Sequence, residues 1–396
     1  MDRSETVRTA IDCGSNRHRF TIVTFWTFPL GWRRSGERPA SSAPSDIWSS
    51  RSEKTMRTTS TTQYNSSESG SLPPLEQVRE DVWALAQPMA RSYLPYSFTY
   101  LLRDTQGGFH VIDPGSDSDE NWANILAAFS QLDASPADVR TIIGTHLHPD
   151  HIGMMQRLRE ASDATTQMHF VERQALSGQV ADEWGAASAE KPIQWGVPDD
   201  RKLEIRRMAD DLPRLVVPKL DQSIDDGEKL QIEGFDITVM LTAGHTSGHI
   251  CLRDDSRSLM YSGDHVLPTI HAGLGLGGKT VSNPLADYLE SLERVSEYPD
   301  YEVLPGHGYR FVGIAERAAA SAEHHLRRVR EVADVIGSTP ELSTWQIASQ
   351  LTWTAGWENL KGFYVYSALA QTDYYREYVE NLMVNQPNPG RPIEPG

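Results

Sequence analysis

Four side chains that can bind a metal ion lie within six consecutive residues of this 396-residue sequence. His146, His148, Asp150 and His151 follow residues 139–145, a segment rich in β-branched side chains that predicts a strand. In an extended chain His146 and His148 project from the same side, because side chains alternate along a strand. Imidazole and carboxylate groups together suit Zn²⁺, Mn²⁺ or Fe²⁺. This spacing therefore predicts a site for a divalent metal ion at the end of a strand.

Three further candidate ligands occupy the same kind of position later in the chain. His245, Asp264 and His307 each follow a short apolar run that is typical of a strand, and each comes directly after a glycine. Glycine lets the backbone turn tightly and leaves space beside a ligand. In layered α/β folds, functional sites assemble at strand ends of this kind. We therefore expect these three residues to join the first four.

In chain order these blocks resemble the metallo-β-lactamase-fold hydrolase superfamily, in the branch of glyoxalase II and the β-lactamase-like hydrolases. The blocks are His-x-His-x-Asp-His at 146–151, then Gly-His, Gly-Asp and Pro-Gly-His, and the resemblance spans roughly residues 75–315. It implies an α/β fold, a four-layer αββα sandwich that binds two divalent metal ions: zinc in the first place, with Fe²⁺ or Mn²⁺ as alternatives. The ligands that the resemblance implies are His146, His148 and His245 for the first ion, Asp150, His151 and His307 for the second, and Asp264 as the bridge.

The resemblance also implies a reaction. Two neighbouring divalent ions lower the pKa of a shared water molecule from about 15.7 towards roughly 7, which supplies hydroxide at neutral pH. The hydroxide would attack a carbonyl or phosphoryl centre, while Asp150 binds a metal ion and accepts a hydrogen bond from the nucleophile. Asp113, in Val-Ile-Asp-Pro-Gly, matches the superfamily's first block and is expected to orient the ligands without binding metal itself. His265 is expected to support or pack behind Asp264.

The expected substrate is a small molecule with an ester-like bond: a thioester, a lactone or an ester. An aspartate at position 264 argues against a true β-lactamase, which usually has Cys or Ser there. The alternatives are a phosphodiesterase or nuclease, a persulfide dioxygenase with a single iron, and hydrolytic removal of a leaving group from an activated ring. Two residues are candidates for the substrate pocket: Trp195, in a segment where the superfamily often inserts a substrate-covering element, and His271, in a glycine-rich loop.

Predicted strands and helices alternate along the chain, which is typical of a layered α/β protein. The predicted strands are 82–86, 97–102, 109–115, 139–145, 235–241, 250–252, 258–261 and 301–304, and the predicted helices are 120–132, 151–161, 284–298 and 314–336. We expect a catalytic domain over 73–315, a helical, winged-helix-like domain over 316–385, and a flexible tail over 386–396.

The first 72 residues differ in composition from the rest. About half of residues 41–71 are Ser or Thr, so this stretch buries too little apolar surface to offset the entropy lost on ordering. The sequence therefore predicts a disordered extension over 1–72. An apolar run over 20–32 could pass for a signal-peptide core, but Thr and Pro interrupt it and no cleavage motif follows. If Met56 is the true start, residues 1–55 do not belong to the mature protein.

The composition of the chain argues against several kinds of partner and environment. Lys and Arg total 37 and Asp and Glu total 54, a formal net charge of −17, which argues against a nucleic-acid partner because phosphate backbones attract basic surfaces. No run of about 18 apolar residues is present, so no membrane partner is expected. The two cysteines, Cys13 and Cys251, lie far apart in sequence, which argues against a disulfide framework and favours the cytoplasm. Whether the protein forms a homodimer is left open by the sequence.

Overall fold

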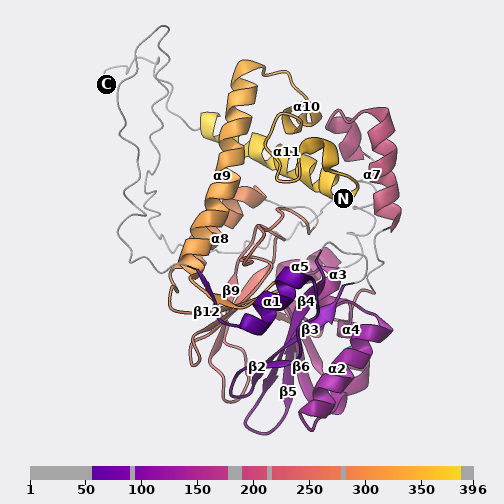
Figure 1. Cartoon of the computed structure of the whole chain (residues 1–396), viewed down its shortest axis with the longest axis vertical. Helices are drawn as coiled ribbons and strands as arrows, with labels where there is room; N and C mark the ends of the chain where they lie inside the picture. Colours follow the sequence, from indigo (N-terminus) through magenta and orange to yellow (C-terminus); the bar gives the residue numbers. More distant parts are fainter. Residues whose placement is uncertain (1–55, 90–93, 177–189, 212–215, 278–281, 385–396) are drawn as a thin grey trace, which may run out of the picture. The chain divides into compact units, whose positions relative to one another are not determined.

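Two β-sheets form the centre of the protein, seen here in a computed structural model that describes residues 56–89, 94–176, 190–211, 216–277 and 282–384, with 206–211 and 383–384 as backbone only (Figure 1). In the described part of the chain, the strand orders are β2-β3-β4-β5-β6-β7-β8 and β1-β13-β12-β11-β10-β9. The first sheet consists of β2 (Glu76–Arg79), β3 (Val82–Pro88), β4 (Tyr96–Arg103), β5 (Phe109–Ile112), β6 (Val139–Gly144), β7 (Thr165–His169) and β8 (Gln222–Ile224). The second consists of β1 (Arg57–Thr58), β9 (Ile237–Leu241), β10 (Ile250–Asp254), β11 (Leu259–Gly263), β12 (Glu302–Pro305) and β13 (Phe311–Val312).

The two sheets pack face to face because alternate side chains of their strands are apolar. Phe98, Tyr100 and Leu102 of β4 belong to the hydrophobic cluster between the sheets. Val239 of β9 and Tyr261 of β11 join the same cluster from the opposite sheet. The rings of Tyr100 and Tyr261 meet edge to face, with their centroids 5.3 Å apart. This shared core fixes the spacing of the strand ends, from which the candidate ligands project.

Helices form the two outer layers of the sandwich. The seven-stranded sheet is covered by α2 (Asp119–Gln131), α3 (Pro149–Ile152), α4 (Met155–Ser162) and α5 (Phe170–Leu176), and the six-stranded sheet by α8 (Pro284–Ser296) and α9 (Ile314–Ser338). A short 3₁₀-helix, η1 (Pro136–Asp138), precedes β6. On the first side, for example, Phe129 of α2 packs with Leu101 of β4. The predicted four-layer αββα sandwich is therefore confirmed.

The C-terminal part of the chain is helical, as predicted. It contains α9, α10 (Thr344–Ala348), the 3₁₀-helix η2 (Trp357–Asn359) and α11 (Phe363–Val384), and α11 also contacts α7 (Asp199–Asp211) (Figure 1). One hydrophobic cluster joins Val303 of β12 to Val329 of α9 and Tyr375 of α11. The core is thus continuous across residue 315, and the division into two domains there stays a prediction. None of the described helices is long and apolar enough to cross a membrane.

The region predicted as one helix over 151–161 is two helices, α3 and α4, with a break at Gly153. A side chain at Gly153 would place its Cβ only 2.4 Å from the carbonyl oxygen of Pro149 and 2.8 Å from the amide nitrogen of Asp117. This close approach lets the chain turn directly after His151. The apolar spacing of the sequence did not reveal the break, because it depends on a neighbouring loop.

The prediction of disorder over 1–72 is wrong for residues 56–72. Residues 57–58 form β1, which pairs antiparallel with β13, and residues 61–69 form helix α1 (Thr61–Ser69). The side chain of Ser60 caps the helix by accepting a hydrogen bond from the amide of Gln63, and Gly70 ends it with a φ of 67°. Residues 1–55, like the predicted tail over 386–396, lie outside the described residues.

Polar contacts order this N-terminal segment, and composition did not reveal them. Thr59 Oγ1 donates a hydrogen bond to Glu302 Oε1 at 2.6 Å, and Ser60 Oγ donates one to Glu76 Oε2 at 2.7 Å. Gln63, which is buried, accepts a hydrogen bond from the amide of Arg310 at 3.0 Å. A Ser/Thr-rich segment can therefore fold where it meets buried charged groups that need partners.

Candidate metal centre

The structure brings all seven predicted ligands together in two neighbouring groups. The first group is His146, His148, His245 and Asp264, and the second is Asp150, His151 and His307. Within each group the potential ligand atoms lie within 4.8 Å of one another. These groups coincide with the two metal sites that the sequence predicted, with Asp264 placed in the first group.

Asp264 faces both groups at once. Its Oδ2 lies 3.7 Å from Nε2 of His245, in the first group. Its Oδ1 lies 3.3 Å from Nε2 of His151 and 3.4 Å from Nε2 of His307, in the second group. A carboxylate that directs one oxygen to each group has the placement that a bridging ligand requires.

Parallel strand pairs account for this convergence. β11 and β12 are parallel neighbours, so the residues that follow them, Asp264 and His307, emerge at the same edge. In the other sheet β5 and β6 are parallel neighbours, so Asp113 and His146 emerge together at that sheet's edge. His245 lies in the loop between the antiparallel strands β9 and β10. The ligands therefore come from strand ends of both sheets.

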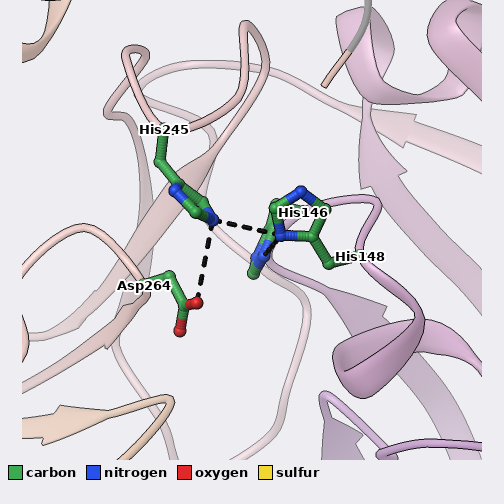
Figure 2. A group of neighbouring side chains, drawn as sticks. All are labelled: His146, His148, His245 and Asp264. Carbon is green, nitrogen blue, oxygen red and sulfur yellow. Dashed lines mark hydrogen bonds and ion pairs between the residues drawn. The ribbon is translucent and has the colours of Figure 1, made fainter. Parts of the chain in front are cut away.

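In the first group, backbone carbonyls determine which ring nitrogens face the centre. His148 donates a hydrogen bond from Nε2 to the carbonyl of Leu276 at 2.8 Å, and His245 donates one from Nδ1 to that of Gly273 at 2.6 Å. The unprotonated nitrogens, His148 Nδ1 and His245 Nε2, then lie 3.1 Å apart. Figure 2 shows these nitrogens turned towards each other and the carboxylate of Asp264 turned towards His245.

Asp113 supports two further imidazoles with one buried carboxylate. Its Oδ1 accepts the amide of Thr145 at 2.7 Å, and its Oδ2 accepts the Thr145 hydroxyl at 2.7 Å and Nδ1 of His151 at 2.9 Å. Since the hydroxyl proton of Thr145 is directed to Asp113, Thr145 Oγ1 accepts the proton of His146 Nδ1, at 3.0 Å. Asp113 has a φ of 53°, a strained backbone conformation for a residue other than glycine. It has the contacts that its predicted orienting role requires.

The donor atoms fit divalent metal ions. His146 Nε2 lies 2.9 Å from His148 Nδ1, although the outward hydrogen bonds leave a lone pair on each atom. Nε2 of His151, Nε2 of His307 and Oδ1 of Asp264 are buried and make no hydrogen bond with any residue that the structure describes. In the first group, lone pairs converge in a buried place with no proton between them, and in the second group buried nitrogen and oxygen atoms lack a hydrogen-bond partner among the described residues; both arrangements suit a bound cation.

Glycine at position 306 also belongs to this fit. A Cβ there would lie 2.4 Å from Asp264 Oδ1 and 2.7 Å from Cε1 of His151. The Gly before His307 is thus required for the close approach of the two groups, as the sequence pattern suggested.

The two groups differ in charge when no cation is bound. Burial, followed by the charge of His148, lowers the pKa of His245 to about 4, and burial likewise holds the pKa of His146 well below its usual value. Burial alone would lower the pKa of His307, but the carboxylates of Asp264 and Asp150 outweigh it and raise the pKa to about 10. The first group therefore offers neutral imidazoles, whereas bound cations would replace protons in the second.

Two further residues, Glu172 and His249, support the site through backbone amides. Glu172 of α5 is fully buried, and burial raises its pKa to about 7. Its Oε2 accepts the amide of Leu147 at 2.8 Å and its Oε1 the amide of Gly248 at 2.6 Å. His249 accepts the amide of Asp264 at its Nε2, at 3.1 Å. The place of His249, four residues after His245, marks it in the sequence, whereas Glu172 was missed because it lies in no motif.

Of the two predicted pocket residues, Trp195 lies in a core. It is only 3% exposed and packs edge to face with Tyr366 of α11, with ring centroids 5.3 Å apart. Its cluster consists mainly of residues from α10 and α11. This position does not support the prediction that Trp195 lines a substrate pocket.

His271 lies on a loop that touches the first ligand group but turns its ring to α9. The ring stacks on that of His324 with centroids 4.1 Å apart, and Nδ1 lies 3.1 Å from Ser321 Oγ. A role for His271 in substrate binding therefore stays a prediction. His265 is fully buried, with its ring 5.0 Å from that of Tyr288, which is the packing environment that was expected for it.

Comparison with known proteins gives matches over the region that holds this centre. The family model described as "Metallo-beta-lactamase superfamily" matches residues 93–307. Beta-lactamase-like protein 2 homolog of Caenorhabditis elegans is 24% identical over 259 residues, which are 65% of this chain and 72% of the relative. A metallo-beta-lactamase family protein of Thermus thermophilus superimposes with a TM-score of 0.64 at 23% identity, over 78% of this chain and 95% of the other.

Two other relatives have names that specify a reaction. Hydroxyacylglutathione hydrolase GloC of Haemophilus influenzae is 24% identical over 230 residues, which are 55% of this chain and 89% of the relative. Acyl-coenzyme A thioesterase MBLAC2 of Homo sapiens is 28% identical over 191 residues, which are 47% of this chain and 61% of the relative.

Proposed function

Because the chain belongs to the metallo-beta-lactamase superfamily, we propose that it is a metal-dependent hydrolase that cleaves the thioester bond of a small molecule. The observation that carries the proposal is the convergence of seven metal-binding side chains in two groups with Asp264 between them. Support for a thioester comes from two relatives, whose names specify an acyl-coenzyme A thioesterase and a hydroxyacylglutathione hydrolase. Lactones and simple esters are the related substrates to test beside it.

Divalent metal ions, zinc first, would be held by the two groups of ligands. When bound, such ions supply a hydroxide nucleophile near neutral pH and a Lewis acid for the carbonyl oxygen. The chain's own part is to present neutral imidazoles and carboxylates in fixed directions. Asp113, Thr145 and the carbonyls of Gly273 and Leu276 do this by fixing the tautomers of the histidines.

Asp150 is the candidate for orienting the nucleophile. Its side chain is 21% exposed, compared with 2% for His307, so it lies on the open side of the second group. Burial alone would raise the pKa of Asp150, but the positive charges of His151 and His307 hold it well below the usual range. Ser97 donates a hydrogen bond to the carbonyl of Asp150 at 2.7 Å and fixes its backbone. The ionised carboxylate can accept the proton of a nucleophile and aim it at the scissile bond.

The decisive experiment is a substrate panel on protein of known metal content. Purified protein is assayed with an acyl-coenzyme A, an acylglutathione, a lactone, a simple ester, nitrocefin and a bis-aryl phosphodiester, and metals are counted by mass spectrometry. Two divalent ions per chain with the fastest turnover on thioesters would support the proposal. Turnover of the phosphodiester alone would replace it with a phosphodiesterase. One iron per chain, with oxygen uptake on a persulfide and no hydrolysis, would replace it with a dioxygenase.

A further inference from the structure

A buried glutamate connects the two loops that supply the histidines of the first ligand group. Glu172 lies in α5, just after the end of β7, and its side chain is completely inaccessible to solvent. Each carboxylate oxygen accepts one backbone amide: Oε2 that of Leu147 at 2.8 Å, and Oε1 that of Gly248 at 2.6 Å. A buried carboxylate is costly unless its oxygens have donors, and here each oxygen has one.

Both amides lie between ligands or supporting histidines. Leu147 stands between His146 and His148, so the hydrogen bond fixes the turn from which both imidazoles project. Gly248 follows His245 by three residues and directly precedes His249, whose Nε2 accepts the amide of Asp264. All four members of the first group are thus in, or bonded to, a loop that Glu172 holds.

The chain is built for this close contact. A Cβ at position 248 would lie 2.7 Å from the amide nitrogen of Glu172 and 2.9 Å from its Oε1. Only glycine allows the loop after His245 to approach α5 to hydrogen-bonding distance. Gly248 therefore leaves the space in which Glu172 can accept the hydrogen bond of its amide.

We propose that Glu172 is a positioning residue for the first metal ion, because it sets the distance between the His146–His148 loop and the His245–His249 loop. The inference rests on the proposed function, since it concerns how the same metal centre is formed. The backbone amides that Glu172 accepts belong to these two loops, whereas Asp150 and His151 lie in α3, which begins after His148, and His307 follows β12. Loss of the carboxylate should therefore lower the affinity for one metal ion much more than the affinity for the other.

The test is a zinc titration of metal-free Glu172→Gln against a chromophoric chelator. The substitution keeps the shape of the side chain but turns an amide NH₂ towards one of the two backbone N–H groups, so one loop loses its partner. We expect the affinity for one of the two zinc ions to fall by roughly 10–100-fold, the usual effect of losing a partner that orients ligands. The other ion should keep its affinity. Glu160→Gln, an exposed glutamate on α4, is the matched control and should bind like the wild type.

Thermal unfolding separates positioning from general support. A positioning role reduces the rise in Tm on adding zinc, whereas a purely structural role lowers the Tm of the metal-free and zinc-loaded proteins by the same amount. Excess zinc should restore turnover in Glu172→Gln by mass action. If the variant does not fold, Gly248→Ala, which pushes the loop away from Glu172, must show the same selective loss.

The outcomes distinguish this inference from the proposed function. Wild-type protein that binds no divalent ion would overturn the proposed function itself. Wild-type protein that binds two ions, with Glu172→Gln and Gly248→Ala binding both equally well, would overturn only the role of Glu172. An equal loss of affinity for both ions would also overturn the role of Glu172, because such a loss would show a general packing defect.

Discussion

Asp113 controls His146 through a single hydroxyl group, that of Thr145. The carboxylate accepts the hydroxyl proton at 2.7 Å, and the hydroxyl oxygen then accepts the proton on Nδ1 of His146 at 3.0 Å. The same carboxylate accepts Nδ1 of His151 at 2.9 Å. One buried acid therefore orients an imidazole in each ligand group, so the two predicted metal sites share a support.

Replacing Thr145 with valine should weaken metal binding while keeping the shape of the side chain. The variant loses the acceptor for His146 Nδ1, so the ring can adopt the wrong tautomer, and we expect a loss of roughly 10–100-fold in zinc affinity. A zinc titration of the metal-free protein measures it. Thr105→Val, in an exposed loop, is the control. Unchanged affinity in Thr145→Val would show that the hydroxyl does not relay the orientation.

His148→Ala should abolish metal-dependent turnover. The residue is a direct ligand in the proposed centre, so the loss should exceed the roughly 100-fold upper effect of an outer partner. The fold should survive, because the side chain's hydrogen bond to the backbone carbonyl of Leu276 is worth only about 1 kcal/mol. Turnover and metal content are measured beside the Tm of the metal-free protein. A folded variant with full activity would show that the ligand assignment is wrong.

Deleting residues 1–72 should destabilise the protein, contrary to what the composition of this segment suggested. The deletion removes β1 and α1 and takes partners from Glu302, Glu76 and the amide of Arg310. Glu302 and Glu76 keep their ion pairs with Arg310 but each lose one donor, and the buried amide of Arg310, left without its acceptor, costs about 1–3 kcal/mol. Urea unfolding should show the loss as a lower midpoint. A chain that begins at Met56 keeps these contacts and is the matched control; equal midpoints for the two truncated chains would contradict the expectation.

Stability should fall in mild acid in part because of two stacked histidines. Burial, then His324 and Arg317, lowers the pKa of His271 to about 3, and burial, then Arg328 and Arg327, lowers that of His324 to about 4. In the unfolded chain both pKa values are about 6.5. The unfolded state therefore binds protons first, and this contribution to stability is present above pH 6.5 and is lost as the pH falls towards 4.

The measurement is urea unfolding of metal-free protein at several pH values between 7 and 4.5. The double variant His271→Asn, His324→Asn should lose less stability over this range than the wild type. All other histidines titrate in both proteins, so the difference between the two curves isolates this pair. Parallel curves would show that the pair does not take part.

The resemblance of the sequence blocks to a known superfamily implied the sandwich and the assignment of ligands to two metal ions, whereas local patterns predicted the strands near whose ends these ligands lie. The segments before His146 and His245 have compositions typical of strands, and the ligands follow within a few residues, so the local sequence placed them near strand ends. Glu172 could not be found in this way, because its role depends on two loops that lie 25 and 76 residues away in sequence. The burial of Trp195, which does not support a place in a pocket, also depends on a residue far along the chain, Tyr366.

During synthesis on the ribosome, β1 is made long before β13, the strand with which it pairs. Thr58 Oγ1 donates a hydrogen bond to the carbonyl of Arg310, the residue before β13, across 252 residues of sequence. At about 5–20 residues per second, the first strand would wait roughly 10–50 s for this partner. His307, the last of the proposed ligands, is made only three residues before Arg310. The edge of the six-stranded sheet and the metal centre therefore become complete at almost the same moment. A nascent chain that stops before this point has neither, so the protein most needs protection from aggregation while the segment between Thr58 and Arg310 is being made.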